Sequence, residues 1–122
     1  MAKPNLIGGT AYIKLDGVQH MSRGNWTYNH GKPTRKTVFD GNLSVGYTEE
    51  PQEPMIEGDM TVPATLDTAA LVVADGITVT LELENGNVVV LRDAWFANEG
   101  TVDVNAGSMP AKFVGRSLEV MR

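Results

Sequence analysis

Hydrophobic and polar residues alternate most regularly in residues 77–84. The even positions hold threonine or glutamate, whereas the odd positions hold Ile77, Val79, Leu81 and Leu83. A repeat of two residues is typical of a β-strand with one buried face. Asn85-Gly86 follows and favours a two-residue type I′ turn, in which both residues take positive φ. The pattern therefore predicts a β-hairpin over residues 77–96.

A two-residue turn would fix the register of this hairpin. It pairs Glu84 with Asn87, and so places Leu81 opposite Val90 and Glu82 opposite Val89. The returning strand is apolar on both faces, which indicates that it is covered on both sides. The cover can come from the rest of the chain or from another copy. The residues concerned are Val88, Val89, Val90 and Leu91.

Similar signals predict most of the remaining elements. Asp16-Gly17 indicates a second hairpin that pairs Leu15 with Val18 and Ile13 with His20. Residues 25–36 are polar, with Gly31 and Pro33 as breakers, and predict a long loop or an extended hairpin tip. Further strands are expected at residues 38–47, interrupted at residues 40–41, and at residues 55–62, 101–104 and 111–121.

One helix is predicted between residues 65 and 76. The apolar residues Leu66, Ala69, Ala70 and Val73 follow helical spacing, Thr65 is a candidate N-cap, and Asp75-Gly76 ends the segment. A helix this short needs to dock on a sheet. With six to eight short strands, the sequence predicts a mainly β fold, a β-sandwich or barrel-like single domain over residues 1–122.

Composition narrows the functional classes. The chain has no cysteine, which excludes disulfides and thiolate chemistry, and no apolar run is long enough to predict a membrane span or a signal peptide. We therefore expect a soluble protein with no membrane anchor. Ten basic against fifteen acidic residues give a net charge of −5, which argues against a protein that grips nucleic acid. An acidic surface still suits a protein past which DNA slides.

The sequence predicts no catalytic residue, no cofactor and no metal site. Residues 31–34 are similar to part of a phosphate-binding loop, but the glycine spacing fails. The two histidines, His20 and His30, have no nucleophile-elbow serine to act with, and we expect His20 to be structural. Trp26, Tyr28, Trp95 and Phe96 leave open a small β-sandwich module that binds glycans.

Four segments taken together resemble one family. They are KPNLIGGTAYIKLDG near the start, the GY-x-E-x-P-x-x-P-x-IEGD run at residues 46–59, TVTLELENGNVVVLRDAW, and AKFVG at residues 111–115. In order and spacing they resemble the Mu-like tail tube proteins of contractile-tailed bacteriophages.

The resemblance implies a structural virion protein. Its subunits would form hexameric rings that stack into the inner tail tube and share a β-barrel between subunits. DNA would pass through the lumen into the host without specific binding. Implied partners besides the chain itself are the tail sheath, tape-measure, baseplate and tail terminator proteins. The implied location is the virion tail, after assembly in the host cytoplasm. The tube of a headless contractile particle or of a secretion system is an alternative.

The implied tube has subunit interfaces, a lumen and contacts between rings, and candidate residues can be named for each. The basic segment at residues 30–36 and the acidic Glu49, Glu50, Glu53, Glu57 and Asp59 are expected to meet across a subunit boundary. Candidates for the subunit interface are Val88, Val89, Val90, Leu91 and Trp95. Candidates for the lumen are Glu82 and Glu84. Candidates for the contact between stacked rings are His30, Lys32, Arg35 and Lys36.

Overall fold

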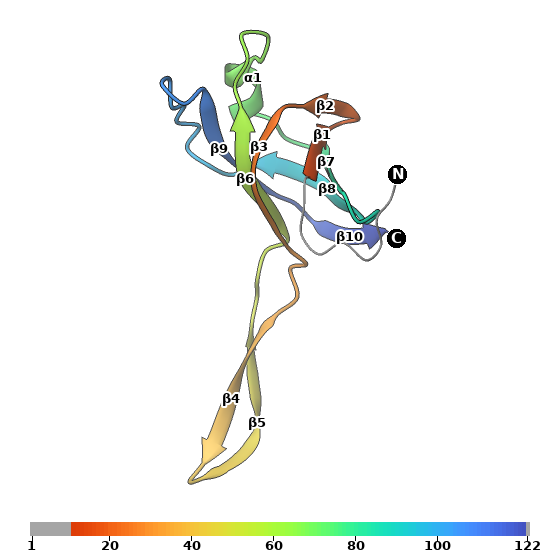
Figure 1. Ribbon diagram of the computed structural model, residues 1–122. Helices are drawn as coiled ribbons and strands as arrows, with labels where there is room; N and C mark the ends of the chain where they lie inside the picture. Colours follow the sequence, from red (N-terminus) through yellow and green to blue (C-terminus); the bar gives the residue numbers. More distant parts are fainter. Residues whose placement is uncertain (1–10, 122) are drawn as a thin grey trace.

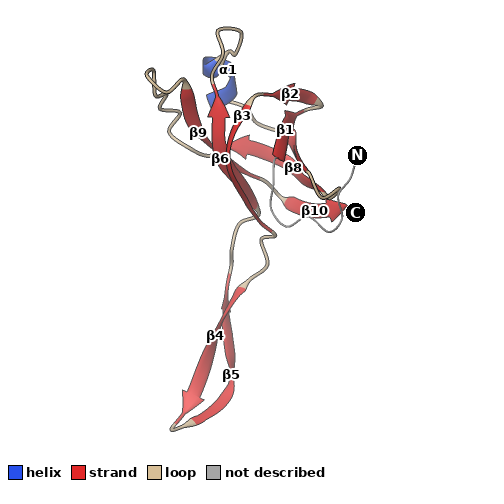
Figure 2. Cartoon of the chain, viewed as in Figure 1, coloured by secondary structure: helices blue, strands red, loops and turns tan. Residues whose placement is uncertain are grey.

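The computed structural model describes residues 11–121, and within them the chain is built mainly from antiparallel strands (Figures 1 and 2). The mainly β class is confirmed. Residues 3–10 of the first family segment lie outside the described residues. The elements are β1 (Ala11–Leu15), β2 (Val18–His20), β3 (Ser22–Asn29), β4 (Thr34–Asp40), β5 (Leu43–Glu50), β6 (Met55–Thr61), α1 (Thr68–Val72), β7 (Ile77–Leu83), β8 (Val88–Phe96), β9 (Ser108–Val114) and β10 (Ser117–Met121).

The body of the molecule contains every strand except β4 and β5. Its strands follow the order β2-β1-β7-β8-β9-β6-β3, and β10 also pairs with β8. The first part of β8 pairs with β10, from Val88 opposite Met121 to Arg92 opposite Ser117, and its end pairs with β9 at Trp95 and Phe96. We call β2-β1-β7-β8-β10 the first sheet and the end of β8 with β9, β6 and β3 the second sheet.

The core lies between the two sheets. Phe96 at the end of β8 meets Phe113 of β9 edge to face, with ring centroids 5.6 Å apart. The inner positions of both sheets are apolar and buried, and α1 contributes Leu71. The core residues include Ile13, Leu15, Val79, Leu81, Val89, Leu91 and Leu118 from the first sheet, and Ile56, Met60, Met109, Ala111 and Phe113 from the second.

The register predicted for the main hairpin is wrong by one residue. Leu81 lies opposite Val89 and Thr80 opposite Val90. The turn has three residues, because the Leu83 N–H donates to the Asn87 carbonyl at 2.9 Å, and only Gly86 takes a positive φ, of 98°. This is the geometry of a type I turn followed by a glycine bulge. The shift brings Val89 onto the same face as Leu81, so the alternating side chains of both strands share one core.

The Asp16-Gly17 hairpin is confirmed, with Leu15 opposite Val18 and Ile13 opposite His20. Both turn residues have positive φ, of 51° and 84°. The Asp16 carboxylate also accepts a hydrogen bond from the Thr78 N–H at 2.8 Å, which ties the turn to β7. This hairpin therefore forms one end of the first sheet.

The predicted helix exists, but its cap and buried face differ. Asp67, not Thr65, is the N-cap, and its carboxylate accepts a hydrogen bond from the Ala70 N–H at 3.1 Å. Leu71 is the buried residue, whereas Val73 is 75% exposed. With only five residues, α1 does not need the wide apolar stripe of a longer helix. No helix within residues 11–121 has the length and apolar character to cross a membrane.

Three other expected elements are also corrected. Residues 25–36 are not one loop, because β3 continues to Asn29 and β4 begins at Thr34. Residues 101–104 form no strand and contribute a single bridge between Asp103 and Ser108. The strand expected at residues 111–121 is instead β9 and β10, separated at Gly115 and Arg116.

Candidate assembly surfaces

Strands β4 and β5 form an arm that extends away from the body (Figure 1). They pair with each other from Thr34 opposite Glu50 to Asp40 opposite Leu43, and with no other strand of residues 11–121. Every residue of both strands is exposed. An isolated two-stranded hairpin is at best marginally stable in water. The arm therefore has the character of a segment that packs on another molecule.

The two faces of the arm differ in polarity. Arg35 pairs with Glu49 and Thr37 with Tyr47, so these side chains share one face. The Arg35 guanidinium lies 4.4 Å from the centre of the Tyr47 ring, which agrees with this assignment. Alternation along each strand adds Phe39 and Val45 to this face, and the bulge between them places Ser44 opposite Phe39. We call this the Phe39 face; its residues are Arg35, Thr37, Phe39, Ser44, Val45, Tyr47 and Glu49.

The Phe39 face is the more apolar of the two. Its outer part consists of Phe39, Val45 and Tyr47, which are 63%, 62% and 49% exposed. The opposite face places Lys36 beside Thr48, Val38 beside Gly46 and Asp40 beside Leu43, so it carries two exposed aliphatic side chains and no aromatic ring. Exposed apolar groups that lie together mark interaction sites. The Phe39 face is therefore the candidate contact surface of the arm.

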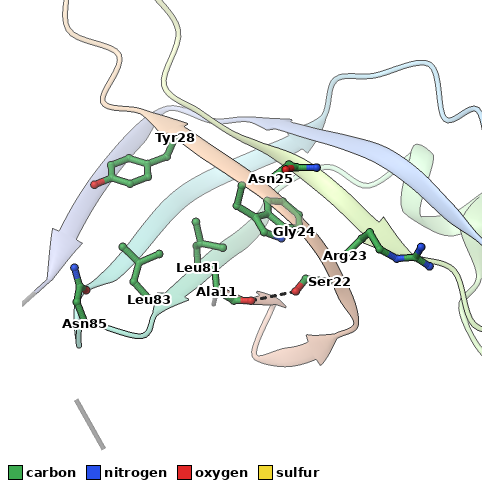
Figure 3. Close-up of a pocket in the computed structure, with 10 residues that line it drawn as sticks. Ala11, Ser22, Arg23, Gly24, Asn25, Tyr28, Leu81, Leu83 and Asn85 are labelled. Carbon is green, nitrogen blue, oxygen red and sulfur yellow. Dashed lines mark hydrogen bonds between the residues drawn. The ribbon is translucent and has the colours of Figure 1, made fainter. Parts of the chain in front are cut away.

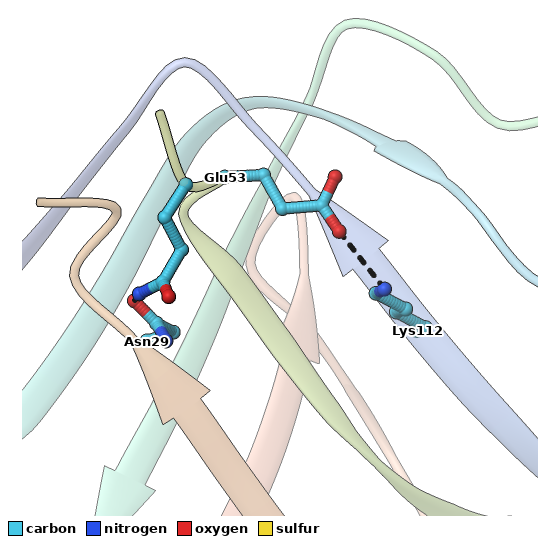
Figure 4. A network of polar contacts seen from close by, with 4 residues as sticks. Asn29, Glu53 and Lys112 are labelled. Carbon is cyan, nitrogen blue, oxygen red and sulfur yellow. Dashed lines mark hydrogen bonds and ion pairs between the residues drawn. The ribbon is translucent and has the colours of Figure 1, made fainter. Parts of the chain in front are cut away.

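A polar network fixes the base of the arm to the body (Figure 4). The Asn29 side-chain oxygen accepts hydrogen bonds from Gln52 Nε2 at 2.7 Å and from the Gly31 N–H at 2.9 Å. Lys112 on β9 forms an ion pair with Glu53 at 2.9 Å. This hydrogen bond raises the pKa of Lys112, assisted by the negative charges of Glu53 and Glu57. These contacts lie where the arm joins the body.

The outer face of the first sheet is a second candidate surface. It is defined by the residues that alternate with the core residues of β1, β7, β8 and β10, and it carries both charged and apolar side chains. Val90 on this face is 7% exposed, whereas Val88 is half-buried. The face comprises Tyr12, Lys14, Thr80, Glu82, Val88, Val90, Arg92, Glu119 and Met121.

The first sheet ends in two different strands. β2 pairs only with β1, and β10 pairs only with β8, so each leaves a row of backbone groups without a strand partner among residues 11–121. Val18 on β2 and Met121 on β10 are 61% and 44% exposed. An open strand edge is a template for pairing with another chain. The sheet can therefore be continued at both ends.

Comparison with known proteins identifies the family. Residues 5–120 match the family model described as phage tail tube protein. The chain belongs to the phage tail tube protein family. Of the curated proteins, the Mu-like prophage FluMu tail tube protein of Haemophilus influenzae is 32% identical over 97 residues, which cover 80% of this chain and 81% of that protein. The resemblance to Mu-like tail tube proteins is confirmed. Tail tube proteins are structural components of phage tails, and this chain is not an enzyme.

The predicted interface residues of this tail tube protein divide into two groups. Val89 and Leu91 are fully buried in the core of their own chain, so the subunit itself accounts for their burial. Val88 and Val90 lie on the outer face of the first sheet, and Trp95 is 38% exposed. Among the five candidates, only Val88, Val90 and Trp95 are exposed or point away from the core. Their contact with a neighbouring subunit stays a prediction.

The predicted lumen residues lie at one end of β7. Glu82 is on the outer face of the first sheet and forms an ion pair with Lys14 at 2.8 Å. Glu84 follows the strand as the first residue of the turn and is half-buried. Their position in a lumen stays a prediction.

The ring-stacking candidates lie at the base of the arm and in the part of β4 nearest the body. His30 contacts the Tyr28 ring edge to face at 5.7 Å, and Lys32 follows in the connection to β4. Arg35 lies 4.0 Å from Glu49 across the hairpin, and Lys36 is exposed on the opposite face. Arg35 thus already has an acidic neighbour, Glu49, in its own arm. Sequence reasoning missed Phe39, Val45 and Tyr47, although their alternation with polar neighbours was a usable signal.

An open cavity of about 410 Å³ lies between β3 and the ends of β1 and β7 (Figure 3). Tyr28, Leu81 and Leu83 line it together with the Trp26 ring. That ring packs on Gly58, where an added Cβ would lie 2.4 Å from the ring atoms. One ring face of Trp26 is therefore used within the subunit. The glycan-binding alternative gains no support from this site, and family membership assigns the chain to a different class.

The described residues suggest no chemistry beyond assembly. Within residues 11–121 there is no group of three or more His, Asp or Glu side chains placed to hold a metal ion. His20 is half-buried on β2, and burial lowers its pKa from the ordinary value. It lies beside a smaller cavity of about 270 Å³ bordered by Thr61, Pro63 and Leu66.

Proposed function

We propose that this protein assembles head to tail into closed hexameric rings, and that the rings stack into the inner tail tube through which phage DNA enters the host. The observation that carries the proposal is the arm. The outer part of its Phe39 face is apolar and, within residues 11–121, is exposed rather than packed on the body. Such a face is stabilised only when another subunit covers it.

The open edges of the first sheet support ring formation. A ring needs a heterologous contact, in which one surface of a subunit meets a different surface of the next. β2 and β10 are two such different surfaces at opposite ends of one sheet. Pairing β10 of one copy with the β1–β2 edge of the next would continue the sheet from subunit to subunit and close it into a shared barrel. The number six follows from the resemblance to Mu-like tail tubes.

The same arrangement orients the subunit. The second sheet covers the inner face of the first, so a barrel made of first sheets has the second sheets on one side only. With the second sheets outside, the outer face of each first sheet lines the lumen, and Glu82 is exposed to it. The outside of the tube then contacts the sheath protein. The lumen holds the tape-measure protein before DNA passes, and the tube ends meet the baseplate and terminator proteins. Assembly takes place in the host cytoplasm.

A matched pair of arm variants tests the proposal. Val45→Thr and Val38→Thr make the same chemical change on opposite faces of the arm. A hydroxyl group buried without a partner costs about 1–3 kcal/mol. Each 1.4 kcal/mol corresponds to a tenfold change in an equilibrium constant. We expect Val45→Thr to raise the concentration needed for tube formation about fivefold to 100-fold, and Val38→Thr to raise it much less.

The measurement is electron microscopy of the purified chain, with sedimentation to determine the critical concentration. Thermal unfolding checks that both variants keep the wild-type body, because neither residue contributes to the core. Equal tube formation by both variants would show that the Phe39 face is not the contact. A wild-type chain that stays monomeric at every concentration would refute assembly itself. Particles that contain tubes but no DNA would favour the headless-particle alternative.

A further inference from the structure

The charged side chains on the outer face of the first sheet are arranged as two ion pairs. Lys14 on β1 lies 2.8 Å from Glu82 on β7, and Arg92 on β8 lies 3.5 Å from Glu119 on β10. Each pair links two adjacent strands. Lys14 and Arg92 are the only cations that the register places on this face within residues 11–121. Every cation of the face thus has a carboxylate beside it.

These ion pairs contribute little to the stability of the subunit. The four side chains are between 31% and 56% exposed. Exposed pairs typically contribute about 0–1 kcal/mol, because water screens the attraction and holding long side chains in place costs entropy. The core beneath them is apolar and fully buried. The effect of the pairs therefore lies in the electrostatic potential of the face rather than in the fold.

We propose that Glu82 and Glu119 neutralise Lys14 and Arg92 so that the outer face of the first sheet does not bind the phosphates of double-stranded DNA. This inference rests on the proposed function, which turns that face toward the lumen. A cation that contacts a phosphate releases condensed counterions and gains affinity, and this gain adds up over many contacts. Two cations per subunit, repeated around every ring of a long tube, would otherwise retain the DNA. The carboxylates compete with phosphate for the same cations.

The Phe39 face and the ion-paired face therefore have opposite tasks. The first gains affinity from contact with another subunit, whereas the second avoids affinity for a polyanion that moves past it. A face whose positive and negative charges cancel differs from a uniformly acidic lining. It weakens attraction without a strong field that would repel DNA from the tube entrance. A tube that guides DNA benefits from this balance.

The test removes the carboxylates and keeps the cations. Tubes of the double variant Glu82→Gln and Glu119→Gln are mixed with a short fluorescent DNA duplex, and retained DNA is measured at increasing salt. We expect wild-type tubes to retain no DNA. The variant tubes should retain it at low salt, with log K falling against log salt by at least about 1.8, or about 0.9 for each of two cations. Adding Lys14→Gln and Arg92→Gln should abolish retention.

The control variant Glu57→Gln with Glu99→Gln changes net charge by the same amount on exposed positions outside the first sheet. Retention by this control equal to that of the Glu82/Glu119 variant would overturn the proposal, because net charge alone would explain the result. An NMR titration of the duplex into unassembled subunits carrying Val45→Thr tests neutralisation of the cations separately from the luminal orientation of the face. Binding by free Glu82/Glu119 variant subunits but not by their tubes would support neutralisation and refute the luminal orientation. Binding by neither form would refute neutralisation.

Discussion

Gly31 is the residue at which a single methyl group should redirect the arm. Its φ of 76° lies in the left-handed region, and an added Cβ would lie 2.6 Å from the backbone nitrogen of Pro54. Ordinary contact begins at 3.4 Å. Gly31→Ala therefore requires the two connections between arm and body to separate by about 0.8 Å. The alanine would also have to adopt the left-handed conformation, in which its Cβ crowds the following carbonyl oxygen.

The magnitude follows from the geometry of the arm. Neighbouring strands lie about 5 Å apart, so a separation of about 0.8 Å at one side of the base corresponds to a rotation of roughly 0.16 radian. β4 has seven residues and reaches about 23 Å at about 3.3 Å per residue. The tip would move by roughly 4 Å. The left-handed conformation adds about 1–2 kcal/mol of strain for alanine.

The matched control is Gly41→Ala at the tip of the arm. Gly41 also has a positive φ, of 64°, but a Cβ there meets nothing within 4 Å. Both variants therefore carry the backbone strain, and only Gly31→Ala displaces the base. We expect Gly31→Ala to reduce tube formation at least tenfold more than Gly41→Ala, as measured by sedimentation and electron microscopy. Equal assembly of the two variants, with the bodies folded, would refute the reasoning that the base sets the direction of the arm.

Three further predictions concern the body. Leu91→Ala should lower the free energy of unfolding by about 2–5 kcal/mol in denaturant titrations of the subunit, because Leu91 is fully buried; a change below 1 kcal/mol would contradict its place in the core. Burial lowers the pKa of His20 from 6.5, so its stabilising contribution is present above about pH 6.5 and is lost as pH falls through its folded-state pKa. His20→Gln should make the free energy of unfolding less dependent on pH in this range. An unchanged pH profile would contradict the link between the burial of His20 and stability. Gly58→Ala should displace the Trp26 ring, whose atoms lie 2.4 Å from the new Cβ; unchanged tryptophan fluorescence and stability would argue against this close packing.

The sequence predicted the elements of the body better than their register. Alternation over residues 77–83 is a direct consequence of a sheet with one buried face, and it identified β7 correctly. The Asn85-Gly86 turn was ambiguous, because a glycine with positive φ suits both a two-residue and a three-residue loop. The core decided between them by placing Val89 beside Leu81. Local turn chemistry could not supply that tertiary preference.

The arm was difficult to predict because it has no core of its own. A strand that is buried on one face must alternate, whereas β4 and β5 are exposed throughout and tolerate polar residues such as Thr34 and Thr48 on either face. The first residues of β4 therefore resemble a loop, whereas residues 38–47 were predicted as strands interrupted at residues 40–41. The resemblance to tail tube proteins identified the family, but it matched no residue of 20–39 to a role, and the ring-stacking candidates there were chosen because they form a basic segment. The contact surface became visible only when the pairing showed which side chains share a face.

The junction between β9 and β10 has a mechanical consequence. Both strands pair with β8 in one register, from Phe113 opposite Phe96 to Met121 opposite Val88, and the Arg116 N–H donates to the Arg92 carbonyl between them at 3.0 Å. One continuous backbone therefore runs through both sheets. A force that pulls the sheets apart along this strand loads many hydrogen bonds at once in shear, instead of opening them one by one. The wall of a tube built from such subunits should resist stretching along this strand.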